Sequence, residues 1–191
     1  NNFSIKRISF LESLLTKLNK GTKIISTTGY TSREIHQLRK LKNLKNSSDF
    51  YMVGGMGHAS NVALGYSAYS KYKKVIVLDG DGSLLMHLGS LGVVTRYGGK
   101  NFKYILLRND MHESVGGQPT NSKHVNYKLL SKSFGFHSYF LIKSEFHFKN
   151  VLKKFMNSSG PIFLEVRIKI QSMNNLKRPK NLIAIRNSFM I

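Results

Sequence analysis

The stretch VIVLDGDGSLLMHLGSL, residues 75–91, decides the fold of this chain. Its first four residues are apolar and predict a strand that is buried on both faces, and the apolar spacing after Ser83 predicts a helix. Between strand and helix lie Asp79 and Asp81, each followed by a glycine. A strand, a tight loop and a helix in direct succession are typical of α/β proteins, so two carboxylates are expected at one end of a buried strand.

The same succession recurs along the chain. Apolar runs predict further strands at 22–26, up to Val53, at 102–110, at 137–142 and at 161–168. Helices are expected over residues 9–19, 84–96 and 126–136. Three further helices are expected to begin at a capping box formed by Thr31 and Glu34, near Ser60, and after a cap at Ser144, the last of them reaching Asn157. Alternating strands and helices form right-handed crossovers, so the predicted fold class is α/β, a parallel sheet flanked by helices.

Four loops are expected to gather at one edge of this sheet, because ligands of parallel sheets bind at the carboxyl ends of the strands. These loops are residues 27–29, 54–58, 79–83 and 109–120. The alternation stops near Gln171. The predicted organisation is therefore one binding domain, residues 1–170, followed by an arm or lid, residues 171–191.

The composition is that of a globular protein. The chain has 191 residues, of which 41% are hydrophobic and 20% charged, and this suits a single domain. It has no cysteine, no apolar run long enough to span a membrane and no evident signal peptide. We therefore expect a cytoplasmic protein with no membrane partner.

The charge of the chain is strongly positive. There are 30 Lys and Arg against nine Asp and Glu, a net charge of +21, which attracts nucleic acid, acidic partners or anionic substrates. The basic residues are scattered from Lys6 to Arg186, as a bias in codon usage would also produce. No recognisable nucleic-acid-binding motif accompanies them, so a nucleic-acid partner is disfavoured. An acidic partner, an anionic substrate and a codon bias all stay open as origins of the charge.

The loop LDGDGS, residues 78–83, has the chemistry of a phosphate and metal site. Glycines let the backbone come close to a ligand, and Ser83 with the first amides of the next helix can hold an anion. A carboxylate beside a phosphate requires a cation between them, and Mg²⁺ is the usual one. The alternative is that Asp79 and Asp81 are ordinary turn residues.

A second feature favours the metal site. The Gly-Asp-Gly motif at 80–82 is followed by 26 residues and then by Asn109, at the end of the next expected strand. This pairing resembles the signature of the diphosphate-binding domain of thiamine diphosphate-dependent enzymes. The resemblance implies thiamine diphosphate and Mg²⁺ as cofactors, with Mg²⁺ bound by the side chains of Asp81 and Asn109 and the carbonyl of Met111. It leaves Asp79 a structural role.

The segment VGGMGHAS, residues 53–60, is also similar to this family. By resemblance the carbonyl of Gly54 accepts a hydrogen bond from the amino group of the cofactor, and Met56 supports the cofactor in a bent shape. The cofactor-binding residues implied in all are Thr28, Gly29, Gly54, Met56, Gly80, Asp81, Gly82, Ser83 and Asn109.

The chain resembles most the subfamily of phosphonopyruvate decarboxylases and sulfopyruvate decarboxylase β-subunits. Four segments carry this resemblance, in the same order as in the subfamily: STTGYTSRE, GGMGHASNVALG, LDGDGSLLMHLGSL and MHESVGGQPT. This implies decarboxylation of a small anionic 2-keto acid, with the phosphonate or sulfonate headgroup left open. The chain departs from that pattern at Arg108, Asp110 and Glu113, where Asn, Gly and Asp are expected. An inward-pointing Arg108 would put a cation near Mg²⁺ and weaken its binding.

Two histidines are candidate catalytic residues together with Met56. His58 and His112 can titrate near neutral pH, so either can relay protons or hold the second anion of the substrate. Ser114 and Gln118 can donate hydrogen bonds to the anionic headgroup. The alternative for each histidine is a solvated loop residue.

The resemblance also implies a partner. Enzymes of this family activate the cofactor with a glutamate from a separate pyrimidine-binding domain. None of the five glutamates of this chain suits that task, because each is expected in a helix, in the last strand or in the loop on the diphosphate side: Glu12, Glu34, Glu113, Glu145 and Glu165. The chain is expected to correspond to the second half of such a decarboxylase, with an α-subunit or another part of a longer chain completing a hetero- or homo-oligomer.

Three rival hypotheses remain at this point. The chain could be another subunit of the same cofactor class, such as an acetolactate-synthase-like carboligase. It could instead be a non-catalytic assembly subunit that kept the fold, or a basic nucleic-acid-binding protein.

Overall fold

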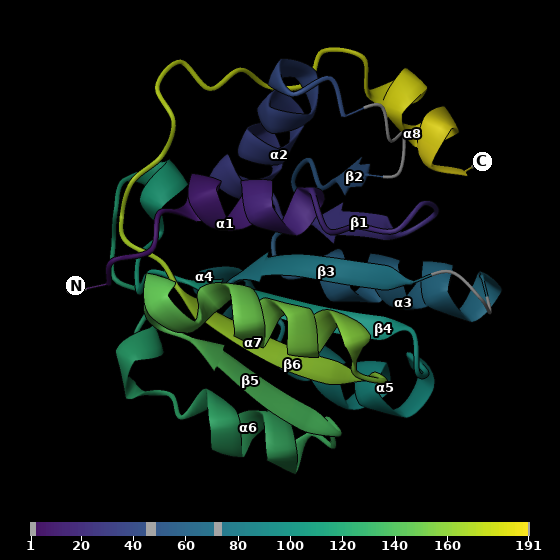
Figure 1. The fold of residues 1–191 in the computed structure, drawn as a ribbon, viewed down its shortest axis with the longest axis vertical. Coiled ribbons are helices and arrows are strands. Elements are labelled where there is room, and N and C mark those ends of the chain that lie inside the picture. Colours follow the sequence, from purple (N-terminus) through teal and green to yellow (C-terminus); the bar gives the residue numbers. More distant parts are fainter. Residues whose placement is uncertain (1–2, 45–48, 71–73, 191) are drawn as a thin grey trace.

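The computed structural model describes residues 3–44, 49–70 and 74–190. Within these ranges six strands form one sheet, all paired in parallel, in the order β2-β1-β3-β4-β6-β5 (Figure 1). The strands are β1 (Lys23–Ser26), β2 (Asp49–Tyr51), β3 (Val75–Gly80), β4 (Phe102–Arg108), β5 (Ser138–Ile142) and β6 (Ile162–Arg167). The predicted α/β class, a parallel sheet flanked by helices, is confirmed.

Helices cover both faces of the sheet, with α1 and α7 in front and α3 and α5 behind in Figure 1. The helices are α1 (Arg7–Leu15), α2 (Tyr30–Leu41), α3 (Ala59–Tyr69), α4 (Asp81–Met86), α5 (Ser90–Tyr97), α6 (Tyr127–Ser133), α7 (Glu145–Asn157) and α8 (Leu182–Met190). Two short 3-10 helices, η1 (Glu113–Val115) and η2 (Ser122–His124), lie between β4 and α6.

The central strands are buried on both faces because successive side chains of a strand point in opposite directions. In β3, Ile76 belongs to the core under α1, α2 and α7, whereas Val77 belongs to the core under α3, α5 and α6. Ile105 and Leu106 of β4 divide in the same way. Two packed layers of helices therefore hold the central strands in place, and the loops at their ends are built on a rigid base.

The predicted capping box is wrong. Helix α2 begins at Tyr30, with Gly29 in the N-cap position, so Thr31 lies inside the helix and caps nothing. The carboxylate of Glu34 instead accepts a hydrogen bond from Arg7 Nε at 2.7 Å. Both side chains are buried, and a buried arginine requires a carboxylate partner, which outweighs a local cap.

The helix expected over 84–96 is two helices, with a break between His87 and Gly89. The glycine-rich loop before α3 packs against this break. A Cβ atom on Gly57 would lie 2.9 Å from Cβ of His87 and 3.2 Å from the carbonyl oxygen of Ser83. The close approach of the loop, together with the low helix propensity of glycine, accounts for the interruption.

Three smaller expectations differ at element ends. The first helix covers residues 7–15 rather than 9–19. Strand β2 ends at Tyr51, and Val53 is exposed beyond it. Ser144 is the N-cap residue of α7 as expected, but its side chain makes no capping hydrogen bond.

The C-terminal segment leaves β6, passes α2 and ends in α8 beside β2 (Figure 1). Phe189 of α8 is only 3% exposed, and its ring lies 5.4 Å from that of Phe50 and 5.0 Å from that of Tyr66. Lys23 Nζ donates to the carbonyl of Phe189 at 2.6 Å. The segment is thus attached at its end, and its role as an arm or lid stays a prediction.

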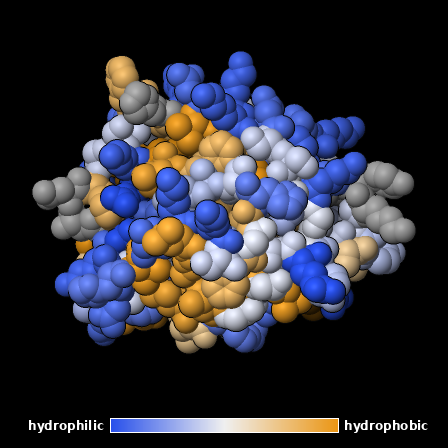
Figure 2. Space-filling view, turned by 90° about the horizontal axis from the view of Figure 1, so that it is seen from below, coloured by the Kyte–Doolittle hydropathy of each residue, from blue (hydrophilic) through white to orange (hydrophobic). Residues whose placement is uncertain are grey.

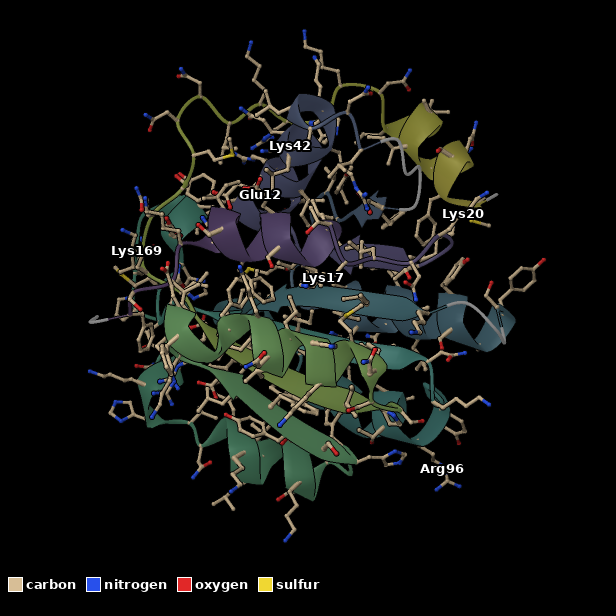
Figure 3. The ribbon with its side chains drawn as sticks, in the orientation of Figure 1. Glu12, Lys17, Lys20, Lys42, Arg96 and Lys169 are labelled. Atoms are coloured by element: carbon tan, nitrogen blue, oxygen red, sulfur yellow. The ribbon has the colours of Figure 1, made fainter. Side chains whose placement is uncertain are left out.

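The surface is largely hydrophilic and basic. Figure 3 shows Lys20, Arg96 and Lys169 at the periphery of the molecule on different sides. Lys42 pairs with Glu12 at 2.7 Å. Seen from below, an apolar area lies in the middle of the face and hydrophilic side chains border it (Figure 2). Among the described residues no helix has the length and apolar character that a membrane crossing requires.

Candidate active site

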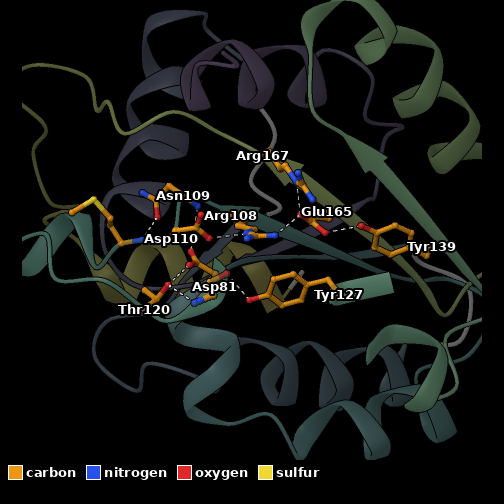
Figure 4. A network of polar contacts seen from close by, with 11 residues as sticks. Asp81, Arg108, Asn109, Asp110, Thr120, Tyr127, Tyr139, Glu165 and Arg167 are labelled. Atoms are coloured by element: carbon orange, nitrogen blue, oxygen red, sulfur yellow. Dashed lines mark hydrogen bonds and ion pairs between the residues drawn. The ribbon is translucent and has the colours of Figure 1, made fainter. Parts of the chain in front are cut away.

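The ends of β3 and β4 meet at the edge where the loops were expected to gather. Gly80, the last residue of β3, pairs with Leu107 of β4. This register brings Asn109 to Asp81, and the backbone N–H of Asn109 donates to Asp81 Oδ1 at 3.4 Å. The two side chains predicted to bind metal therefore lie together (Figure 4).

The Asp81 carboxylate is buried, with 1% of the residue exposed. Burial raises the pKa of this carboxyl, and the hydrogen bonds from the Thr120 hydroxyl and the Asn109 backbone oppose the rise. None of the ion pairs found in the described part of the chain includes Asp81. A buried carboxylate without a cationic partner at the edge of the sheet fits a divalent cation.

The Asn109 side chain is held in a defined orientation. Its Oδ1 accepts a hydrogen bond from the Met111 N–H at 3.1 Å, and its Nδ2 donates to Glu113 Oε2 at 3.0 Å. A side-chain amide oxygen has two lone pairs, so it can be a metal ligand as well as a hydrogen-bond acceptor. No group of three or more histidines and carboxylates suited to a metal occurs among residues 3–44, 49–70 and 74–190. A metal here would rest on a carboxylate, an amide oxygen and a carbonyl, the oxygen donors that Mg²⁺ prefers.

Arg108 does not put an unmatched cation at this site. Its Nε donates to Asp110 Oδ1 at 2.7 Å and its Nη1 to Glu165 Oε1 at 3.1 Å (Figure 4). Tyr139 and Arg167 bind the same glutamate, at 2.6 and 2.9 Å. Since two carboxylates match its charge, the structure gives no support to the expectation that Arg108 weakens metal binding.

Asp79 lies behind the site in a structural position. It is 1% exposed, and Tyr104 OH donates to its Oδ2 at 2.6 Å. The Gly80 N–H donates to its Oδ1 at 2.9 Å. Burial raises the pKa of Asp79. The carboxylate thus joins two adjacent strands, as its expected structural role requires.

Ser83 connects three of the loops. Its Oγ accepts hydrogen bonds from Thr27 Oγ1 at 2.9 Å and from the Gly57 N–H at 3.0 Å. The loops after β1 and β2 are therefore tied to the start of α4. The hydroxyl predicted to bind phosphate also holds the walls of the site together.

A cleft of about 210 Å³ opens between these loops. Eleven of the predicted residues line it, namely Thr28, Gly29, Met56, Gly80, Asp81, Gly82, Ser83, Asn109, Met111, His112 and Ser114. Met56 is half-buried, at the edge where the cofactor was expected. This volume is below the roughly 300–1,000 Å³ of ordinary small-molecule sites.

His112 lies directly against Gly82. A Cβ atom on Gly82 would come within 2.3 Å of His112 Cε1 and 3.0 Å of Thr120 Cγ2. Only glycine at this position leaves room for the imidazole, which lines the cleft. The structure therefore gives His112 a position from which it can reach a bound ligand.

Three predicted residues lie outside the cleft. Gly54 lines a neighbouring groove of about 310 Å³, here called the side groove. His58 is exposed at the start of α3, and its ring lies 4.3 Å from that of His87. Gln118 also lies outside the cleft, whereas Ser114 lines it. The roles of Gly54, His58 and Gln118 stay predictions.

Sequence reasoning missed several residues of the cleft. Thr120, which binds Asp81, ends the segment MHESVGGQPT, whose pattern could have indicated it. Arg7, Arg33 and Arg178 line the cleft from three distant parts of the chain. No local pattern marks them, because only the fold brings them together.

Comparison with known proteins relates the chain to one family. Residues 27–166 match the family described as "Thiamine pyrophosphate enzyme, C-terminal TPP binding domain". Over 174 residues the chain is 36% identical to the phosphonopyruvate decarboxylase of Streptomyces viridochromogenes, covering 91% of this chain and 42% of that protein. It is 33% identical over 153 residues to the sulfopyruvate decarboxylase subunit beta of Methanocaldococcus jannaschii, covering 78% of each.

A solved structure supports the fold. It belongs to a protein of Mycobacterium smegmatis provisionally described as a thiamin diphosphate-dependent enzyme, and it matches with a TM-score of 0.69 at 18% identity. The match covers 86% of this chain and 32% of that one. The chain thus spans less than half the length of this protein and of the Streptomyces relative.

We predict that Gly82→Ala displaces His112 from the cleft. By helix propensity alone, alanine would stabilise this helical position by about 1 kcal/mol relative to glycine. A net loss of stability would therefore show that the added methyl group overlaps His112 and Thr120. We expect the free energy of unfolding to fall by about 1 kcal/mol and the His112 imidazole resonances to shift. Gly80→Ala is the control, because nothing lies within 4 Å of its added Cβ. Unchanged His112 resonances in Gly82→Ala would contradict the packing described.

Proposed function

Because the chain belongs to the thiamine pyrophosphate enzyme family, as its C-terminal cofactor-binding domain, we propose that it forms the diphosphate-binding part of a 2-keto acid decarboxylase. The proposed substrate is phosphonopyruvate or sulfopyruvate. The names of the Streptomyces and Methanocaldococcus relatives support this choice.

One observation carries the proposal. Asp81 is a buried carboxylate without an ion pair among the described residues, and it lies beside Asn109 in a cleft that Gly80 and Gly82 also line. Asp81, Asn109 and the carbonyl of Met111 would hold Mg²⁺. The backbone at 80–82 would approach the diphosphate closely, as glycine permits.

When bound, thiamine diphosphate supplies an electron sink for the carbanion left by departing CO₂. The residues of this chain bind and orient. Met56 would support the organic part of the cofactor from the wall of the cleft. His112, packed on Gly82, would hold or deliver a proton at its imidazole, as histidine side chains do in general acid–base catalysis.

The proposal includes a partner that supplies the activating glutamate. Glu34 and Glu113 both bind Arg7, and Glu165 binds Arg108 and Arg167. The remaining two, Glu12 and Glu145, do not line the cleft. An α-subunit or a pyrimidine-binding domain would therefore complete both the catalytic groups and the walls of the small cleft. The name of the Methanocaldococcus relative, a β-subunit, supports this arrangement.

The metal assignment predicts that Asp81→Asn and Asn109→Ala each weaken binding of Mg²⁺ with pyrophosphate. Pyrophosphate is a suitable probe because it needs only the diphosphate side of the site. We expect at least a roughly tenfold loss of affinity by calorimetry, since each change removes a metal ligand or its charge. The variants should stay folded, because both side chains lie at strand ends.

Asp79→Asn is the matched control for this measurement. It removes the charge of a neighbouring carboxylate that lies behind the site and binds Tyr104. It should therefore lower the free energy of unfolding and leave the affinity for Mg²⁺ with pyrophosphate less affected than Asp81→Asn does. Equal losses of affinity in Asp79→Asn and Asp81→Asn would show that the choice between the two aspartates is wrong.

We further predict that the chain alone does not decarboxylate phosphonopyruvate or sulfopyruvate in the presence of thiamine diphosphate and Mg²⁺. Turnover should appear when a second polypeptide with a pyrimidine-binding domain is added, because that domain brings the missing glutamate. Turnover is measured as the release of CO₂. Robust turnover by the purified chain alone would refute the division of the active site.

A further inference from the structure

Among the described residues, two cations border the cleft without a carboxylate partner. Arg33 comes from the first turn of α2, and Arg178 comes from the segment between β6 and α8. Both line the cleft and also the side groove, together with Thr28 and Gly29. The two arginines therefore lie where the cleft with Asp81 meets the side groove that Gly54 lines.

The third cation of the cleft is already matched. Arg7 is buried, and it binds Glu34 at 2.7 Å and Glu113 at 2.8 Å. No ion pair of Arg33 or Arg178 occurs in the part of the chain that the structure describes. Arg33 instead lies over the ring of Tyr30, 5.6 Å from its centre. The unmatched positive charge that the described residues bring to the cleft is therefore on these two arginines.

The segment that carries Arg178 is attached to the rest of the molecule on both sides of this residue. Upstream, Arg7 Nη2 donates to the carbonyl of Gln171 at 3.4 Å, and the Met173 N–H donates to Glu34 Oε1 at 2.9 Å. Downstream, α8 is fixed through Phe189, which is buried and bound by Lys23. Arg178 is exposed between these anchors, so its side chain can meet a ligand in the cleft.

A substrate with two anionic groups needs a counter-charge that the metal does not supply. Mg²⁺ and the backbone at 80–82 would already serve the diphosphate. Arginine suits a tetrahedral oxyanion because its planar group donates two parallel hydrogen bonds. We propose that Arg178 and Arg33 form a subsite for the phosphonate or sulfonate headgroup of the substrate. This inference rests on the proposed function and assigns its specificity to residues outside the metal-binding motif.

The test is calorimetric titration of the full chain with phosphonoacetate, an unreactive anion with the same headgroup and a carboxylate. We expect Arg178→Ala and Arg33→Ala each to weaken its binding about tenfold or more, the loss expected for hydrogen bonds between charged groups. Lys177→Ala is the matched control, since it removes one charge from the adjacent exposed residue, which does not line the cleft. It should change the affinity less than about twofold.

A parallel titration with Mg²⁺ and pyrophosphate distinguishes the two possible oxyanions. We expect Arg178→Ala to leave this affinity within about twofold. A loss for pyrophosphate but not for phosphonoacetate would assign the cations to the cofactor and overturn the proposal. Equal weakening in Arg178→Ala and Lys177→Ala, or no phosphonoacetate binding by the unsubstituted chain, would also overturn it. Failure of the proposed function would appear separately, as absence of Mg²⁺-dependent pyrophosphate binding in the unsubstituted chain.

Discussion

The parallel pairing of β3 with β4 is the constraint on which the candidate site depends. Because Gly80 lies opposite Leu107, the residues that follow the two strands meet at one edge of the sheet. Asp81 and Asn109 are 28 positions apart in the chain, yet the backbone of one binds the carboxylate of the other. A slip of one residue in this register would turn one of these side chains to the opposite face of the sheet. Burial of β3 and β4 between two helix layers prevents such a slip.

A buried charge network joins the rest of the molecule to this edge. Arg7 binds Glu34 of α2 and Glu113 of the loop after β4, and Glu113 in turn accepts from Asn109. The same arginine binds the carbonyl of Gln171 at the start of the C-terminal segment. Removing one member of a buried pair leaves an uncompensated charge and costs about 3–5 kcal/mol. The network therefore makes the geometry of Asn109 depend on the first helix and on the last segment.

The sequence predicted what is determined locally or by topology. Apolar runs located the strands, and the rule that loops gather at the carboxyl edge placed the loops at 79–83 and 109–120 together. The family resemblance singled out Asp81 and Asn109 within these loops. The predicted capping box was wrong because Glu34 binds Arg7, 27 positions away. The predicted single helix over 84–96 was wrong because the loop at Gly57 packs against it. Arg33 and Arg178 could not be predicted as cleft residues, since their position depends on how a segment without a regular pattern crosses α2. Local signals thus indicated the metal and phosphate chemistry, whereas the charged rim needed the fold.

The most direct test of the account is a crystal structure with thiamine diphosphate and Mn²⁺ in place of Mg²⁺, because anomalous scattering locates the metal independently of the protein density. We expect one Mn²⁺ peak in contact with the side-chain oxygens of Asp81 and Asn109 and with the diphosphate. Bound cofactor with its metal held by other residues, or with the diphosphate outside the cleft at 80–82, would contradict the central claim.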